Sequence, residues 1–303
     1  MVWMRPEGAV VTALLIVIDS VRLRRFSWFP FMTGAVAFVL SLPFVGFKLS
    51  YYGGILPNPF YAKTRIDWEH FQAGFSYVWE FLRHYGFVGI GVLIPALFWR
   101  KLSAWQQALL VYVILYTLYI VSVGGDVLKV HRFFFPVFTG YAVLAFLSIQ
   151  LLTAKFTSGT RALILFACLV PMGILSYALP SKTVTDYNTL ELAFTRKMQS
   201  IAKNMKDSDN RPFSVALATI GIFGYELIGH DIIDMVGLTD STIARHSEPP
   251  IPGMTTTWRE RNLNTAYILT RAPDYVVFST GIKPSAPAER ALMLYRQFTD
   301  AYR

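Results

Sequence analysis

Residues 105–123, WQQALLVYVILYTLYIVSV, and residues 134–153, FFPVFTGYAVLAFLSIQLLT, decide the fold. Neither stretch contains Asp, Glu, Lys or Arg. A helix needs about 20 predominantly apolar residues to cross a bilayer core, and in lipid its backbone groups must be bonded within the segment. Both stretches are therefore predicted to be transmembrane helices, joined by the short polar loop 124–133.

Four further apolar stretches lie on either side of this pair. They cover residues 3–21, 29–48, 85–99 and 162–180, and the third has an amphipathic lead-in from about residue 71. The composition agrees, because 54% of the chain is hydrophobic and only 16% is charged, far from a soluble average. The sequence predicts an α-helical multi-pass membrane bundle of about six transmembrane helices over residues 1–180.

The positive charge is concentrated in this apolar part. Residues 1–180 hold 14 Lys and Arg against 6 Asp and Glu, whereas residues 181–303 hold 14 against 13, which together give the net charge of +9. Basic residues between apolar segments mark cytoplasmic loops, so the excess indicates membrane insertion and not nucleic-acid binding. The single Cys168 excludes a disulfide framework within one chain.

Three basic clusters set the orientation. They lie at 22–25, 100–101 and 155–161, after the first, third and fifth predicted helices, and all fall on one side, the cytoplasm. Loops 49–69 and 124–133 then face outward. The expected location is the plasma (inner) membrane, with the C-terminal domain extracytoplasmic.

Residues 181–303 are predicted to form a small soluble α/β domain. Stretches of helical spacing alternate with short runs typical of buried strands, which favours a parallel sheet of a few strands. The expected elements are helices at 187–205 and 286–302 and strands at 213–220, 231–236 and 274–278.

Loop 49–69 contains the first candidate site, YYGGILPNPFYAK at 51–63. Its glycines and prolines favour an irregular backbone, and its Tyr, Asn and Lys offer hydrogen-bond donors where a lipid phosphate and a sugar would lie. An equally open interpretation is an interfacial turn with an aromatic belt and a lysine that reaches toward the headgroups.

The second candidate is GGDVLKVHRFFFP at 124–136. Charged residues between two apolar helices are costly unless they are paired or bind a ligand. Arg132 suits bidentate contacts to phosphate, and His131 is a candidate general base. The alternatives are that Asp126 and Arg132 pair and only close the loop, and that His131 is a hydrogen-bonding residue.

Three shorter segments give weaker signals. RPEG at 5–8 either contributes to a site or only starts a helix. TIGIFGY at 219–225 either opens a helix toward an anion or forms a tight turn. DMVGLTD at 234–240 either carries two functional carboxylates or is a strand end followed by a capped helix.

Together these segments resemble a known family. The order RPEG, YYGxxLPNxFYAK, GGDxxxxxRFFxP and DxxGLTD is similar to that of multi-pass GT-C glycosyltransferases, and most of all to the mycobacterial terminal arabinofuranosyltransferase family. The resemblance implies transfer of a sugar from a polyprenyl-phosphate donor to a cell-envelope glycan or lipid-linked acceptor at the outer face of the membrane.

The resemblance also implies roles for individual residues. It points to Tyr52, Asn58, Tyr61 and Lys63 around the donor phosphate and sugar, with Asp126 and Arg132 beside them. His131 is added to these candidate substrate-binding residues because of its own chemistry. The resemblance assigns the acceptor side to Asp234, Thr239 and Asp240. The catalytic residue stays unknown, with Asp126 as a further candidate for the base. No cofactor is expected, although a divalent cation is left open because members of the family differ in this respect.

The chain departs from the family at its start. RPEG lies well inside the family pattern, and the family's catalytic aspartate belongs to an earlier outer loop, so the expectation is the C-terminal portion of such an enzyme. Two other classes stay open: a transporter or lipid-handling protein that uses Asp126 and Arg132, and a non-catalytic envelope scaffold. A transporter would usually show internal repeats, and none is visible.

Overall fold

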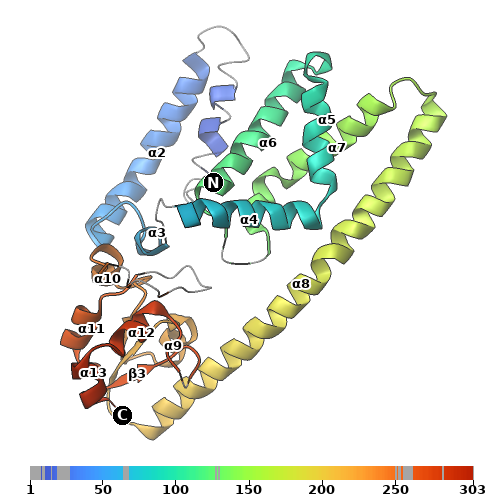
Figure 1. Ribbon diagram of the computed structural model, residues 1–303. Helices are drawn as coiled ribbons and strands as arrows, with labels where there is room; N and C mark the ends of the chain where they lie inside the picture. Colours follow the sequence, from blue (N-terminus) through green and yellow to red (C-terminus); the bar gives the residue numbers. More distant parts are fainter. Residues whose placement is uncertain are drawn as a thin grey trace. The chain divides into compact units, whose positions relative to one another are not determined.

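The computed structural model of the chain has two compact units (Figure 1). Unit 1 comprises Met1–Ile55 and Ile66–Asp186, and unit 2 comprises Leu56–Arg65 and Tyr187–Arg303. Unit 2 thus includes the short segment Leu56–Arg65, which interrupts unit 1 in the sequence. The structure describes residues 8, 11–14, 16–18, 28–63, 68–126, 128, 130–249, 251, 254, 262–281 and 283–302.

The secondary-structure elements described in unit 1 are all helices. Its helices are α2 (Trp28–Tyr52), α4 (Trp68–His84), α5 (Phe87–Leu97), α6 (Ala104–Ser122), α7 (Phe135–Leu152) and the first part of α8 (Ser158–Ser208), with short 3-10 turns at η1 (Trp99–Lys101) and η2 (Arg132–Phe134). Ser103 and Gln106 form a capping box that starts α6. The two decisive apolar stretches thus form a helical hairpin, as predicted.

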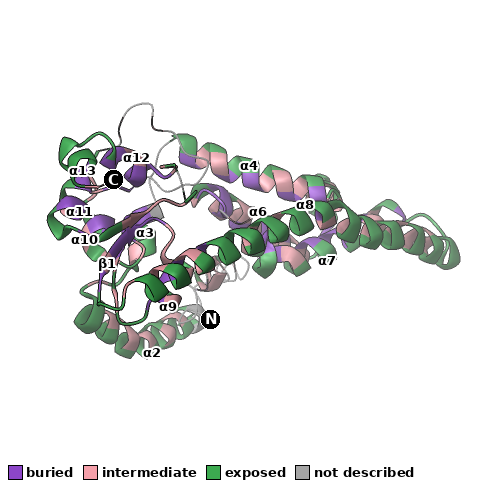
Figure 2. Ribbon diagram, turned by 90° about the horizontal axis from the view of Figure 1, so that it is seen from below, coloured by how far each residue is buried: buried purple, intermediate pink, exposed green. Residues whose placement is uncertain are grey.

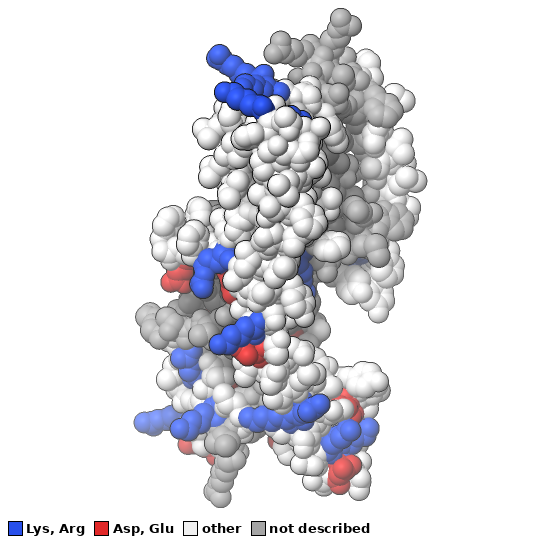
Figure 3. Space-filling view, turned by 90° about the vertical axis from the view of Figure 1, so that its right-hand side faces the viewer, with Lys and Arg blue, Asp and Glu red and all other residues white. Residues whose placement is uncertain are grey.

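Four helices of the described residues are long and apolar enough to cross a membrane. They are Phe31–Tyr52, Ala104–Ser122, Arg132–Leu152 and Ser158–Ser208. A broad surface free of charged side chains has Lys and Arg gathered at one end (Figure 3). The structure therefore agrees with the prediction in being mostly helical, with several apolar helices that could span a membrane.

The number of six spans has no such support. Most of the predicted span 3–21 lies outside the described residues, although residues 11–14 and 16–18 are helical. The predicted span 85–99 forms α5, which has 11 residues and is therefore about 16 Å long.

Unit 1 is held together by close helix packing around an aromatic core. The Phe81 and Phe134 rings stack with centroids 3.6 Å apart, and both side chains are buried. Gly91 faces Ala145 so closely that a Cβ at residue 91 would lie 3.0 Å from the Ala145 nitrogen. Small residues at helix contacts let backbones approach, which is how helices associate in lipid.

Unit 2 is built on a three-stranded parallel sheet in the order β2-β1-β3. The strands are β1 (Ser214–Leu217), β2 (Asp231–Asp234) and β3 (Tyr275–Val277), and the helices, besides the end of α8, are α3 (Asn58–Lys63), α9 (Ile220–Glu226), α10 (Ser241–Arg245), α11 (Thr265–Arg271), α12 (Pro287–Leu292) and α13 (Arg296–Ala301). This confirms the predicted small parallel sheet.

Both faces of the sheet are covered, and each face has its own core. Val215 and Leu217 of β1 lie in the core formed with α8 and α9. Ala216, between them, lies in the core formed with α10, α11, α12 and α13. Strand β1 is buried from Val215 to Leu217 (Figure 2) and β2 is buried at Ile233 and Asp234, whereas β3 is only partly buried. Burial of the central strand is expected where helices cover both faces of a parallel sheet.

Several predicted boundaries were wrong. The predicted helix 286–302 is two helices, because the N–H groups of Leu294 and Tyr295 bond to carbonyls three residues back, at Ala291 and Leu292, and tighten the turn after α12. The predicted strand 213–220 ends at Leu217, and α9 starts at Ile220. Residues 162–180 and 187–205 belong to one helix, α8.

Candidate functional site

The segment between α6 and α7, residues 123–134 with η2 included, is called the polar loop below. Near its start it has two glycines in left-handed conformations. Gly124 has φ +76° and Gly125 has φ +65°. A Cβ on Gly124 would lie 2.6 Å from the His70 ring, and one on Gly125 would lie 2.5 Å from Tyr77. Only glycine fits both the backbone and the space, so α4 fixes the start of this loop.

Asp126 and Arg132 form a bidentate ion pair across the loop. Arg132 Nη2 donates to Asp126 Oδ1 at 3.0 Å, and Arg132 Nε donates to Oδ2. The Leu128 N–H also donates to Asp126 Oδ1, at 3.3 Å. The side chain of Asp126 is only 4% exposed, whereas that of Arg132 is 44% exposed. The pairing left open by the sequence is thus present, and the Arg132 side chain stays partly exposed in it.

His131 is buried next to a second histidine. His84 Nδ1 and His131 Nε2 lie 2.7 Å apart, and both side chains are buried. Burial, and to a smaller extent the neighbouring His84 ring, together lower the pKa of His131 to about 4. His131 is therefore neutral near pH 7 and a weak base. This geometry matches a hydrogen-bonding residue better than the predicted general base.

Sequence reasoning missed the contribution of α4 to this site. His70, Tyr77 and His84 are each seven residues apart, so they lie on one face of α4. The Phe133 N–H donates to Tyr77 Oη at 3.5 Å, and burial raises the pKa of Tyr77 well above its usual range. The regular spacing of these polar side chains on an amphipathic helix was the available signal.

The predicted donor residues of loop 49–69 fall into both units. Tyr52 ends α2 in unit 1, where it is exposed and its ring contacts the rings of Phe47 and Tyr51. Asn58 and Tyr61 belong to α3 in unit 2. The backbone of Lys63 ends α3, and its side chain lies outside the described part of the chain.

Helix α3 packs against α10 inside unit 2. The Arg245 guanidinium lies 5.3 Å from the centroid of the Tyr61 ring, within reach of a cation–π interaction. Ala62 is buried. The predicted residues Asn58 and Tyr61 therefore belong to the same unit as the predicted acceptor residues, and Arg245 is an additional residue at this contact.

Asp234 and Thr239 form a closed turn after β2. Asp234 is fully buried and accepts hydrogen bonds from the N–H groups of Val236 at 3.0 Å, Gly237 at 3.2 Å and Thr239 at 2.7 Å. The Thr239 hydroxyl donates to Asp234 as well. Asp240 accepts from Thr242 N and caps α10. These contacts match the alternative interpretation, a strand end followed by a capped helix.

A buried carboxylate that the sequence did not single out holds the loops after β3. Glu289 has no exposed surface. It accepts hydrogen bonds from the N–H groups of Ser279 at 2.8 Å, Ser285 at 2.7 Å and Ala286 at 3.1 Å. Such a buried carboxylate is stable only because its oxygens are bonded. Glu289 therefore fixes the fold at the carboxyl end of the sheet.

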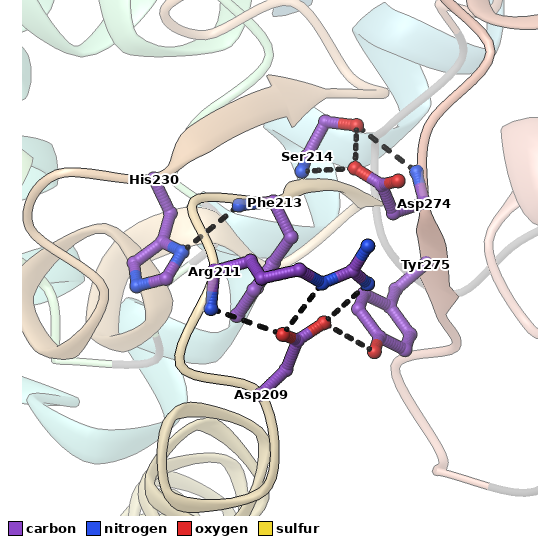
Figure 4. A network of polar contacts seen from close by, with 7 residues as sticks. All are labelled: Asp209, Arg211, Phe213, Ser214, His230, Asp274 and Tyr275. Carbon is purple, nitrogen blue, oxygen red and sulfur yellow. Dashed lines mark hydrogen bonds and ion pairs between the residues drawn. The ribbon is translucent and has the colours of Figure 1, made fainter.

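A second polar network lies at the amino end of the sheet (Figure 4). Asp209 accepts from Arg211 and from the Tyr275 hydroxyl at 3.1 Å, and the hydrogen bonds from Arg211 hold the pKa of Asp209 well below its usual range. Ser214 and Asp274 exchange hydrogen bonds between β1 and β3. Ligands of parallel sheets bind at the opposite end, where the strands have their carboxyl ends. This network therefore has a structural role: it joins the end of α8 to the sheet.

No metal site is visible among the residues that the structure describes, because no three His, Cys, Asp or Glu side chains gather there. Of the weaker predicted segments, 219–225 forms the start of α9 after β1. Residues 5–7 of the RPEG segment lie outside the described ranges.

Comparison with known proteins adds one finding. Residues 185–302 match the model of a domain of unknown function, DUF8728. The match covers less than half of the chain and most of unit 2. No curated protein and no solved structure matches the chain.

Proposed function

We propose that the chain is a membrane glycosyltransferase of the GT-C type, or the C-terminal portion of one. It transfers a sugar from a polyprenyl-phosphate donor to a cell-envelope glycan or lipid-linked acceptor at the outer face of the membrane. The observation that carries the proposal is the half-exposed Arg132, held by the buried Asp126 at the end of an apolar helix long enough to cross a membrane.

The chemistry of the donor explains why this arrangement is suited to it. When the bond between the anomeric carbon and the phosphate oxygen breaks, the leaving phosphate gains negative charge. A preorganised guanidinium stabilises that charge without having to reorganise first. Arg132 is preorganised because Asp126 holds its Nε and Nη2, and its planar fork suits phosphate oxygens.

The proposal gives the polar loop the binding of the donor phosphate and not the proton transfer. The acceptor hydroxyl must lose a proton as it attacks the anomeric carbon. Asp126 is already paired with Arg132, and His131 is a weak base because burial lowers its pKa to about 4. Neither Asp126 nor His131 is therefore proposed as the catalytic base.

The test is donor binding to the full chain reconstituted in lipid nanodiscs. A radiolabelled polyprenyl-phosphate pentose serves as the probe, and Arg132→Gln is compared with Arg100→Gln, which changes an exposed arginine of η1. Loss of one charge-assisted contact lowers affinity by about 10- to 100-fold. Arg132→Lys should lie between the two, because it keeps the charge and loses the fork. Equal binding by folded Arg132→Gln and wild type contradicts the proposal.

A second candidate is a protein that binds the donor lipid without catalysis. It is favoured by one observation: Asp126, Asp234 and Asp240 are all engaged by donors of the chain itself. The same preparation separates the two functions. Binding followed by transfer of the labelled sugar to an acceptor supports the transferase. Binding without any transfer over hours supports the non-catalytic lipid-binding protein.

A further inference from the structure

Helix α4 has three distinct faces. One face packs on the rest of unit 1 and is buried. At 3.6 residues per turn its members fall within about a third of the circumference. They are His70, Gly74, Tyr77, Phe81 and His84.

The other two faces differ sharply in polarity. Trp68, Phe75 and Trp79 are 69%, 58% and 64% exposed and are spaced so that they form one stripe. The partly buried Phe71, Val78 and Leu82 lie beside this stripe. The remaining third of the circumference is polar. It consists of Glu69, Gln72, Ser76, Glu80 and Arg83.

The contacts of α4 place it at the ends of two membrane-spanning helices. A Cβ on Gly74 would meet the Val121 carbonyl oxygen at 2.3 Å, and Val121 lies at the last turn of α6. Tyr77 and Phe81 both contact the ring of Phe134, directly before α7 begins. Helix α4 thus crosses the carboxyl end of α6 and the amino end of α7 (Figure 1).

We infer that α4 lies in the plane of the membrane surface, with the Trp68–Phe75–Trp79 stripe in the lipid and the polar face toward water. A helix that lies at an interface needs these two faces, and tryptophan is enriched at the headgroup level. Lipid is the occupant because unit 1 exposes large apolar side chains on its other helices as well, among them Leu97 of α5 and Phe135 of α7.

This placement has a consequence for the polar loop. The buried face of α4 contacts Gly124, Gly125 and His131, so the loop and α4 share one level. Arg132 then stands at the depth of lipid phosphate groups. The inference depends on the membrane-spanning helices and is independent of sugar transfer.

Depth measurement by spin labelling tests the inference on the full chain in phosphatidylcholine–phosphatidylglycerol vesicles. In a Cys168→Ala background, nitroxide labels are attached to Trp68→Cys and, separately, to Trp79→Cys. Collisions with oxygen and with a water-soluble nickel chelate give the depth of each label. Val36→Cys and Phe47→Cys, also 11 residues apart and exposed on α2, are the matched control pair.

For an interfacial helix, labels at 68 and 79 have the same shallow depth within about 5 Å, and a label on Ser76→Cys collides with the nickel chelate. The α2 pair differs in depth by about 16 Å, the rise of 11 helical residues. A difference of that size between 68 and 79 would mean that α4 crosses the bilayer and would overturn the inference. Nickel collisions at both 68 and 79 without oxygen collisions would overturn it as well, because the stripe would then face water.

Discussion

Removing Arg132 from the Asp126–Arg132 pair should destabilise the protein more than removing Asp126. In Arg132→Ala the carboxylate stays in a site where its side chain is only 4% exposed, and an uncompensated buried charge costs about 3 kcal/mol or more. In Asp126→Ala the half-exposed guanidinium can turn to solvent, so the loss is about 1 kcal/mol, close to the value of an exposed pair.

The double variant makes the prediction sharper. When both side chains are removed, no charge is left buried, so Asp126→Ala/Arg132→Ala should be more stable than Arg132→Ala alone. The expected cost of the double change is about 1 to 2 kcal/mol, well below the sum of the single changes.

Equilibrium unfolding in mixed detergent micelles, followed by far-UV circular dichroism, measures these differences. Arg100→Ala is the control, because Arg100 is exposed and its loss should change the free energy of unfolding by less than about 0.5 kcal/mol. The reasoning is refuted if Asp126→Ala costs as much as Arg132→Ala, or if the double variant costs the sum of the two.

Three further predictions use the same unfolding assay. Gly124→Ala should destabilise by about 2 kcal/mol, because φ is +76° and the new methyl would lie 2.6 Å from the His70 ring, whereas Gly89→Ala, with nothing within 4 Å, should be neutral or stabilising. The pKa of His131 is about 4 in the folded protein and 6.5 ordinarily, so the unfolded chain takes up the proton first as the pH falls. The free energy of unfolding should therefore decrease by at most about 3 kcal/mol between pH 6.5 and pH 4. A His131→Gln variant should lack this decrease. Glu289→Ala should cost about 3 kcal/mol, since it leaves three N–H groups that are buried or partly buried without their acceptor; an unchanged unfolding midpoint would contradict the role assigned to it.

The membrane class and the parallel sheet could be predicted because both depend on local pattern. Uncharged stretches such as 105–123 are conspicuous in a single sequence, and short apolar runs separated by helical spacing favour parallel strands. Boundaries were less predictable. Nothing between residues 181 and 186 breaks a helix, and α8 accordingly runs through the expected end of the last span.

The surroundings of the site could not be predicted, because they depend on contacts between distant segments. Asp126 and Arg132 are six residues apart, and their pairing was among the interpretations the sequence allowed. The partner of His131 is His84, 47 residues earlier. Likewise, no local pattern indicates that α3 belongs to the unit formed by residues 187–303.

The origin of α3 in an early loop has a consequence for biogenesis. Its residues leave the ribosome about 180 residues before α10, the helix on which they pack. At 5 to 20 residues per second, α3 waits for roughly 10 to 40 seconds before its partner exists. Unit 2 therefore cannot complete its core during synthesis of the earlier helices, and its final assembly must follow the synthesis of α10.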